Sequence, residues 1–353
     1  MIKPPPFPIE PSGVDAELLS EALGVDVVDV SLERIGADRG MLGEIFLAHL
    51  TYATPNGHPP RVVVKMAADR EQSLATARRA RTNERELRCY DELLAVTPVR
   101  APQFYAAWYD PETARYLMVQ EAIEADTTVD QLVGIGPERV HATLIEVAKL
   151  HAHWWDSPVL TTHEWLLRPD SPGRMQNLTG FAANGWAAMC ALLPDEFSLE
   201  EQALGREFPA RLGAALTLLG SQARTLIHSD LRADNVLFSL DGKSATIIDW
   251  QGVGVGPPAL DLAYLLSQSL TVADRRAHED ELLRAYWHEM RGLGVDVSFD
   301  KALFGYGESM LYCLSIACAL QIVSDPNEPR VRDLTRVIAR RSLEAMRDHG
   351  QMW

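Results

Sequence analysis

The segment 225–251 carries three side chains whose types and spacing suit phosphoryl transfer. Asp230 precedes Asn235 by five residues, and Asp249 closes an apolar strand fourteen residues after Asn235. Transfer from a nucleotide needs one carboxylate to orient the attacking hydroxyl and accept its proton. An amide and a second carboxylate supply hard oxygen ligands for Mg²⁺. A loop whose Asp and Asn only cap turns is the alternative, and the three residues together favour the chemistry.

A lysine and a glutamate upstream supply what this chemistry lacks. Lys65 ends the β-branched run VVVK, where its ammonium could reach nucleotide phosphates. Glu86 follows 21 residues later on the next predicted helix, where it could pair with Lys65 and aim it. Glu84 is the competing partner. For Lys65 taken alone, an exposed lysine at a strand end is an equally good interpretation.

Two further segments are candidates for nucleotide contacts. Gly36, Gly40 and Gly43 lie between two strands in IGADRGMLGEIF and could form a turn that covers phosphates, although their spacing is not GxGxxG. In LMVQEA, residues 118–122 are expected to link two lobes, so that backbone groups such as those of Val119 and Glu121 could bind adenine.

The elements that must position these residues predict an α+β fold with a small β-rich lobe, 1–121, and a large helical lobe, 122–353. In the first lobe, strands at 25–30, 44–52 and 61–66 precede a helix over 71–95, and a second hairpin flanks DPET, giving five strands. The second lobe is interrupted by the β-rich island 225–251. Its predicted helices lie at 137–155, 197–223, 259–270, 274–293, 300–323 and 328–348.

The motifs resemble the protein-kinase-like fold, in particular its small-molecule branch of aminoglycoside phosphotransferases and choline kinases. KLHAHWW (149–155), HSDLRADNVLF (228–238), IIDWQ (247–251) and DLAYLL (261–266) look most like the ecdysteroid-kinase-like group. The resemblance implies a nucleotide-binding N-terminal lobe and a C-terminal lobe that holds the catalytic loop and the acceptor site.

Residue roles follow from the resemblance. It implies that Asp230 is the catalytic base, that Asn235 and Asp249 bind Mg²⁺, and that Lys65 with Glu86 anchors the phosphates. His228 and Asp261 are implied to support the catalytic loop. Ser229 stands where glycine is usual, and Arg232 occupies a position that varies in the family.

The connection after Asp249 separates this chain from regulated protein kinases. Only WQGVGVGPPAL lies between Asp249 and Asp261, without Ser, Thr or Tyr, so no phosphorylatable activation segment is expected. Gly252, Gly254 and Gly256, followed by two prolines, predict a tight fixed turn.

Composition limits the partners and the compartment. The chain has 353 residues, with 33 Lys and Arg against 49 Asp and Glu, a formal charge of −16. That charge disfavours nucleic acid and anionic membranes as partners. Four cysteines without a CxxC pair indicate a reduced cytoplasm. The uncharged run Ser309–Ser324 is short for a membrane span and predicts a buried helix.

The sequence therefore predicts an ATP- and Mg²⁺-dependent kinase of a hydroxyl group on a small molecule. A lipophilic alcohol such as a steroid or macrolide is the favoured acceptor, since four tryptophans fall within 154–186 and could form an aromatic wall; helix packing is the other explanation for them. An aminoglycoside or choline-type kinase and a non-catalytic nucleotide-binding scaffold are the alternatives. The choice of ATP over GTP and the oligomeric state stay open.

Overall fold

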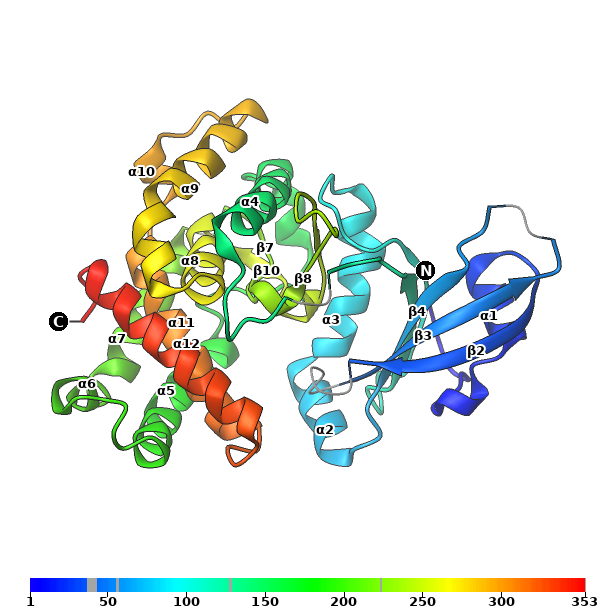
Figure 1. The fold of residues 1–353 in the computed structure, drawn as a ribbon, viewed down its shortest axis with the longest axis horizontal. Coiled ribbons are helices and arrows are strands. Elements are labelled where there is room, and N and C mark those ends of the chain that lie inside the picture. The colour runs from blue at the N-terminus through cyan, green and yellow to red at the C-terminus, as the bar shows by residue number, and fades with distance from the viewer. Residues whose placement is uncertain (37–42, 55–56, 127–128, 223, 353) are drawn as a thin grey trace. The chain divides into compact units, whose positions relative to one another are not determined.

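The computed structural model describes residues 1–352 except 37–42, 55–56, 127–128 and 223. It divides into two compact units, drawn in Figure 1: Met1–Glu124 with Ile248–Gly252, and Ala125–Ile247 with Val253–Trp353. These units differ in two ways from the predicted lobes, which meet at 121/122. The N-terminal unit extends three residues further, and it includes the segment around Asp249, where Arg85 donates a hydrogen bond of 2.9 Å to the Gln251 carbonyl.

The N-terminal unit is built on a six-stranded sheet in the order β1-β5-β6-β4-β3-β2. Among the described residues of this sheet, β1–β5 is the one parallel pair, and both predicted hairpins are present as β3–β4 and β5–β6. β1 was not predicted, because a two-residue strand shows no alternation. The strands are β1 (Ile2–Lys3), β2 (Val27–Ile35), β3 (Gly43–Tyr52), β4 (Arg61–Ala67), β5 (Phe104–Tyr109) and β6 (Tyr116–Glu121).

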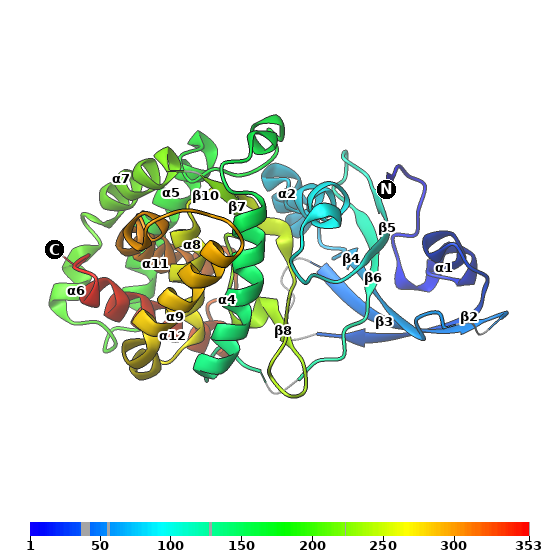
Figure 2. The ribbon, with the colours of Figure 1, turned by 90° about the horizontal axis from the view of Figure 1, so that it is seen from above.

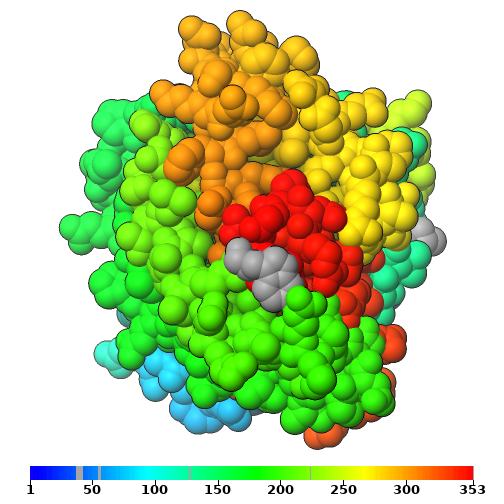
Figure 3. All heavy atoms as spheres, turned by 90° about the vertical axis from the view of Figure 1, so that its left-hand side faces the viewer, coloured from blue at the N-terminus to red at the C-terminus, as the bar shows by residue number. Residues whose placement is uncertain are grey.

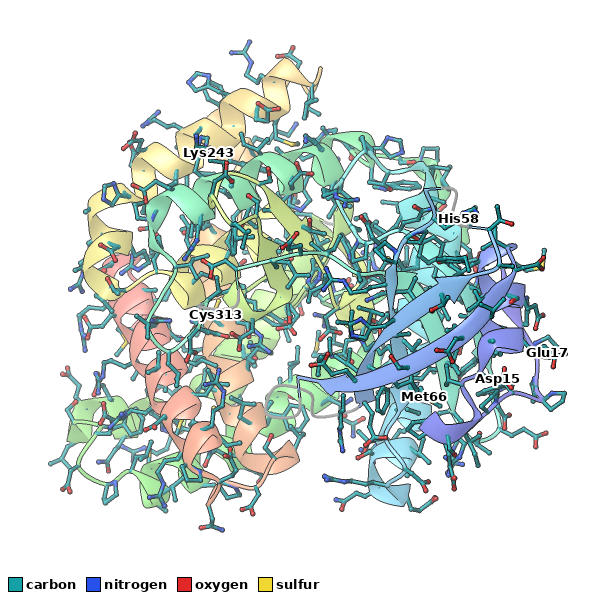
Figure 4. The ribbon with its side chains drawn as sticks, turned by 45° about the vertical axis from the view of Figure 1, so that its right-hand side comes forward. Asp15, Glu17, His58, Met66, Lys243 and Cys313 are labelled. Atoms are coloured by element: carbon teal, nitrogen blue, oxygen red, sulfur yellow. The ribbon has the colours of Figure 1, made fainter. Side chains whose placement is uncertain are left out.

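The helices of this unit differ from the single one predicted. α1 (Ala16–Leu23) is additional; the Asp15 carboxylate, labelled in Figure 4, caps it by accepting from the Leu18 N–H at 2.9 Å. The predicted helix over 71–95 is broken at Arg81, whose φ of 53° is left-handed. It consists of α2 (Glu71–Ala80), α3 (Thr82–Arg88), a π-helical turn Cys89–Leu93 and a 3₁₀ turn Leu94–Val96.

The C-terminal unit is mainly helical, as predicted, and α4 runs beside α9 in it (Figure 2). α11 packs against α5, α7, α8 and α12 and forms the centre of its core. The predicted helix at 300–323 is interrupted at Gly305, which is left-handed with φ 82°. The helices are α4 (Gly136–His153), α5 (Pro172–Leu192), α6 (Leu199–Leu204), α7 (Phe208–Ser221), α8 (Pro258–Ser269), α9 (Val272–Gly292), α10 (Phe299–Ala302), α11 (Tyr306–Val323) and α12 (Pro329–Asp348).

The β-rich island forms two antiparallel pairs: β7 (Thr225–Ile227) with β10 (Gly254–Gly256), and β8 (Val236–Phe238) with β9 (Ala245–Ile247). The predicted tight turn at Gly252–Gly256 was wrong for Gly254 and Gly256, which form a strand. A Cβ on Gly254 would lie 2.2 Å from the Leu167 carbonyl oxygen. Gly254 therefore allows close packing against neighbouring backbone, and Gly256 leaves room for the Ile227 side chain, instead of forming a turn.

One stretch of the described residues, Phe299–Val323, is long and apolar enough to cross a membrane by length and composition. Its most apolar window is 67% buried inside the structure, and Gly305 interrupts the helix, so α11 is confirmed as the buried helix predicted from the sequence. α12 (red in Figure 3) ends at the surface beside α7 and α9, where Arg211 binds the Gln351 carbonyl and Arg276 binds Asp348.

Candidate active site

Lys65 and Glu86 form an ion pair within the N-terminal unit. The Lys65 ammonium, on β4, lies 2.7 and 2.8 Å from the two carboxylate oxygens of Glu86, which α3 holds only 3% exposed. Glu84 faces another direction and accepts two hydrogen bonds from Arg81 at 2.6 and 2.8 Å. The structure thus pairs Lys65 with Glu86 and not with Glu84.

Asp249 completes this group, which we call the anchoring cluster (Lys65, Glu86 and Asp249). Its Oδ1 lies 3.6 Å from the Lys65 nitrogen. Burial alone would lower the pKa of Lys65, but the negative charges of Glu86 and Asp249 outweigh it and raise that pKa well above its usual value, so the lysine is a permanent cation. The Asp249 Oδ1 atom is buried and finds no hydrogen-bond donor among the described residues. The left-handed φ of 65° at Asp249 is a strained conformation of the kind that concentrates at functional sites.

The glycine segment is only partly described. Gly40 lies outside the described residues. Gly43 starts β3, and a Cβ placed on it would lie 3.0 Å from the Met66 carbonyl oxygen, 3.1 Å from the Tyr116 hydroxyl and 3.9 Å from Lys65 Cε. Gly43 is therefore next to the anchoring cluster, and a Cβ there would crowd the Met66 carbonyl and the Tyr116 hydroxyl while only touching Lys65.

Val119 and Glu121 do not lie in a linker. Both belong to β6, an inner strand whose backbone is paired with β4 and β5, and the Glu121 N–H donates to the Gln103 carbonyl at 2.8 Å. The Glu121 carboxylate accepts from Arg100 at 2.7 Å. The backbone groups that leave the sheet are those of residues 122–124, so the predicted linker begins after Glu121.

The catalytic loop, which we define as residues 228–235, lies in the C-terminal unit after β7. The Asn235 amide nitrogen donates to the Asp230 carbonyl at 2.8 Å and to Asp230 Oδ2 at 2.9 Å. Arg232 Nε lies 3.4 Å from the other carboxylate oxygen, Asp230 Oδ1. Two neighbours thus fix the Asp230 carboxylate, and these hydrogen bonds use the Asn235 amide nitrogen but not its amide oxygen.

Asp261 supports this loop from α8. Its two fully buried carboxylate oxygens accept from the backbone N–H groups of His228 and Ser229, both at 2.7 Å. Ser229 has φ 66°, the left-handed region that favours glycine. The sequence predicted Asp261 as a support of the loop and showed an unusual serine at 229. In the structure the loop turns sharply at Ser229, immediately before Asp230, and the Asp261 carboxylate holds this turn.

Three residues of this support were missed by the sequence analysis. His151 Nε2 lies 3.3 Å from Asp261 Oδ2, and its Nδ1 lies 2.8 Å from the Tyr286 hydroxyl. The Tyr312 hydroxyl donates to the Ser229 carbonyl at 2.7 Å. The sequence near His151 shows only a histidine on an apolar helix. Its two partners, Tyr286 and Asp261, lie more than a hundred residues away in the sequence, so local patterns could not reveal them.

Comparison with known proteins supplies short sequence matches and long structural ones. The DUF1679 family, described as "Uncharacterized oxidoreductase dhs-27", matches residues 211–296. Viomycin phosphotransferase from Streptomyces vinaceus is 42% identical over 62 residues, 17% of this chain and 22% of that protein. The "Uncharacterized kinase-like protein D1044.1" from Caenorhabditis elegans is 38% identical over 63 residues, 18% of this chain and 17% of that protein. Each match thus spans about a fifth of the relative's length.

Three solved structures resemble almost the whole chain. A putative aminoglycoside phosphotransferase from Ralstonia eutropha has TM-score 0.58 at 16% identity, covering 95% of this chain and 97% of that one. The chain has the fold of the aminoglycoside phosphotransferases. Two further structures share this fold. The ADP-bound aminoglycoside phosphotransferase APH(2'')-Ib has TM-score 0.51 at 14% identity, covering 94% of this chain and 98% of that one. Macrolide 2'-phosphotransferase type I has TM-score 0.51 at 15% identity, covering 90% of this chain and 93% of that one. The predicted α+β, protein-kinase-like fold, with a sheet-containing N-terminal lobe and a large helical C-terminal lobe, is confirmed.

The oxidoreductase description of the matched family does not fit the aminoglycoside-phosphotransferase fold of the segment. Dinucleotide-dependent oxidoreductases bind their cofactor on a parallel sheet with a glycine-rich turn. Among the described residues of 211–296, the strands form only the two short antiparallel pairs β7–β10 and β8–β9. The same segment contains the catalytic loop and Asp261.

Proposed function

We propose that the chain is an ATP- and Mg²⁺-dependent phosphotransferase that phosphorylates a hydroxyl group of a small molecule. The observation that carries the proposal is the Asp230 carboxylate, fixed on one oxygen by Asn235 at 2.9 Å and placed by a loop that Asp261 holds. Phosphoryl transfer depends mainly on alignment and on electrostatic stabilisation, and a rigid carboxylate next to an amide suits both. In this proposal Asp230 orients the acceptor hydroxyl and takes its proton late in the reaction.

The anchoring cluster supports nucleotide binding. Lys65 is held as a cation by Glu86 and points its ammonium toward Asp249, so it offers a fixed positive charge for phosphate oxygens. Gly43 leaves room beside Lys65. A base would be held by backbone groups of residues 122–124, because Val119 and Glu121 use theirs in the sheet.

The donor set fits Mg²⁺. Asp249 offers a buried carboxylate oxygen without a hydrogen-bond donor among the described residues, and Asn235 offers its amide oxygen while its nitrogen is used by Asp230. Hard oxygen ligands of this kind, few in number, suit Mg²⁺, which keeps part of its shell for water and phosphate. When bound, the ion would neutralise charge on the transferring phosphates. We place the protein in the cytoplasm, in keeping with its four free thiols.

The side chains beside the catalytic loop favour a neutral acceptor over a polycation. Burial raises the pKa of Tyr312 to about 12, so its hydroxyl stays protonated next to Ser229. The Arg174 guanidinium lies 5.6 Å from the centre of the Tyr312 ring. The Tyr312 ring is itself buried, so it offers no aromatic surface. In this proposal the positive charge of Arg174 disfavours a polycationic aminoglycoside and favours a neutral, lipophilic alcohol such as a steroid or macrolide.

The tryptophans of 154–186 do not add an aromatic wall to this proposal. Trp186 packs between the rings of Phe197 and Phe208, with centroids 5.3 and 6.4 Å away. Trp154 and Trp165 are also buried, whereas Trp155 is half-buried. Helix packing explains most of the cluster.

A phosphorylation screen tests the proposed function. The protein is incubated with ATP and Mg²⁺ and with matched sterols, macrolides, aminoglycosides and choline-like alcohols, and products are detected by mass spectrometry. We expect a mass gain of one phosphate on a neutral alcohol, and none with Asp230→Asn under the same conditions. ATP binding without transfer to any acceptor would instead favour a non-catalytic nucleotide-binding scaffold, and transfer only to aminoglycosides or choline would overturn the acceptor class alone.

A further inference from the structure

The arginine beside Asp230 is itself held by a residue from a distant loop. Arg232 Nη1 donates to the Gln131 side-chain oxygen at 2.5 Å and to Asp234 Oδ2 at 3.0 Å, while its Nε faces Asp230 at 3.4 Å. The guanidinium is planar, so fixing Nη1 fixes the direction in which Nε points. Gln131 lies 101 residues before Arg232, between Glu124 and α4, and the motif of the catalytic loop gives no hint of it.

Gln131 is in turn rigidly placed. It is 0% exposed, its N–H donates to Asp234 Oδ1 at 3.3 Å, and its carbonyl accepts from Arg341 at 2.8 Å. Arg341, on α12, also donates to the carbonyls of Gln268 and Leu132 at 2.8 and 3.2 Å. Burial lowers the pKa of Arg341 to about 10, which shows the cost of placing a guanidinium there to bind carbonyl groups.

The Gln131 amide is a poor choice for stability alone. Its nitrogen is buried and finds no hydrogen-bond acceptor among the described residues. A buried polar group left unpaired destabilises a protein by about 1–3 kcal/mol, which offsets the gain of similar size from the Gln131 hydrogen bond to Arg232. A side chain that adds little net stability but aims an arginine at Asp230, the proposed base, is explained by function rather than by packing.

We propose that Gln131 is a positioning residue, which sets the Asp230 carboxylate by holding Arg232 in place. The inference rests on the proposed phosphotransferase activity. It adds that a residue outside the catalytic loop controls the orientation of the proposed base. Because a displacement of about 1 Å at a reacting group lowers rates by up to about a hundredfold, and Asp234 still holds part of the guanidinium, we expect Gln131 to affect kcat by roughly tenfold.

The test compares Gln131→Met, Arg232→Met and the double variant in steady-state kinetics on the full chain. Gln131→Met should lower kcat about tenfold and leave the KM for ATP within about twofold. The melting temperature should stay within about 2 °C of wild type, because the lost hydrogen bond and the removed unpaired nitrogen offset each other. In the Arg232→Met background the same substitution should lower kcat by less than about twofold, because its route to Asp230 is already lost. A residue with a purely structural role would instead lower the melting temperature and act equally in both backgrounds.

Arg330→Gln is the matched control. Arg330 binds the carboxylate of Asp130, the neighbour of Gln131, at 3.1 and 3.3 Å, and this ion pair includes neither the Gln131 side chain nor Arg232, so kcat should stay near wild type. Unchanged kcat in Gln131→Met, while Asp230→Asn is inactive, would overturn the inference and leave the proposed function standing; an active Asp230→Asn would overturn the proposed function. A crystal structure of Gln131→Met gives a readout without turnover: an Arg232 guanidinium still directed at Asp230 would also overturn the inference.

Discussion

Asp261→Asn should destabilise the catalytic loop by about 3 kcal/mol. The two Asp261 oxygens accept hydrogen bonds of 2.7 Å from His228 and Ser229, and neither oxygen is exposed. Hydrogen bonds to charged groups contribute about 1.5–3 kcal/mol each. Asparagine keeps one acceptor and turns its NH₂ group toward the other backbone N–H. The variant therefore loses one of these bonds and leaves one buried N–H group unpaired.

The assay combines urea unfolding with steady-state kinetics. The free energy of unfolding should fall by about 3 kcal/mol, and kcat should fall by at least about a hundredfold in protein that is still folded, because the strained Ser229 conformation is no longer held. Asp280→Asn, at a side chain that is 73% exposed and paired with Arg284, should change either quantity little. A loss below about 1 kcal/mol together with unchanged kcat would refute this account of the loop.

Three smaller predictions concern other described residues. Ser229→Gly removes a non-glycine residue with left-handed φ and a buried hydroxyl without a hydrogen-bond partner among the described residues. The free energy of unfolding should rise by about 1 kcal/mol and the melting temperature by roughly 2 °C, with activity retained; a loss of stability would contradict the prediction. Burial raises the pKa of Glu279, but the His349 hydrogen bond and the Arg275 charge more than offset this and hold it below its ordinary 4.5. The stability that Glu279 contributes is therefore present above about pH 4.5 and lost as the pH falls through the folded-state value; melting temperatures from about pH 6 to pH 3 should fall less steeply in Glu279→Gln, and parallel curves would refute the assignment. Thiol titration of the native protein at about pH 8 should label Cys190 first, because it is the partly exposed thiol, whereas Cys89, Cys313 (labelled in Figure 4) and Cys318 are buried. Burial raises the pKa of all four thiols, so labelling should be slow even at Cys190, and rapid labelling of more than one thiol would contradict the packing.

The candidate residues that sequence reasoning located were those whose geometry is local. Asp230 and Asn235 lie five residues apart in one loop, and their contact follows from that spacing. Lys65 and Glu86 are joined by a strand and the helix after it, so a side chain from each could be expected to meet. Glu84 and Glu86 could not be separated, because the break at Arg81 sets the phase of α3 and no glycine or proline marks it.

The more distant residues that support the loop could not be found from local spacing. His151, on α4, contacts Asp261 although the two residues are 110 positions apart in the sequence, and Tyr312, on α11, donates to the carbonyl of Ser229, 83 positions away. Hydrophobic periodicity shows which helix face is buried but not which polar group it meets there. The glycines after Asp249 illustrate a second limit, since Gly254 is required by the approach of Leu167 and not by a turn.

The central claim is that Asp230 carries transfer of a phosphoryl group from ATP to an alcohol. A single-turnover experiment with γ-labelled ATP, Mg²⁺ and the best acceptor from the screen tests it most directly, with wild type and Asp230→Asn compared at equal nucleotide occupancy measured by equilibrium binding. We predict label on the acceptor with wild type, and a rate at least about a thousandfold lower with Asp230→Asn although ATP still binds. Transfer by Asp230→Asn at the wild-type rate would contradict the account.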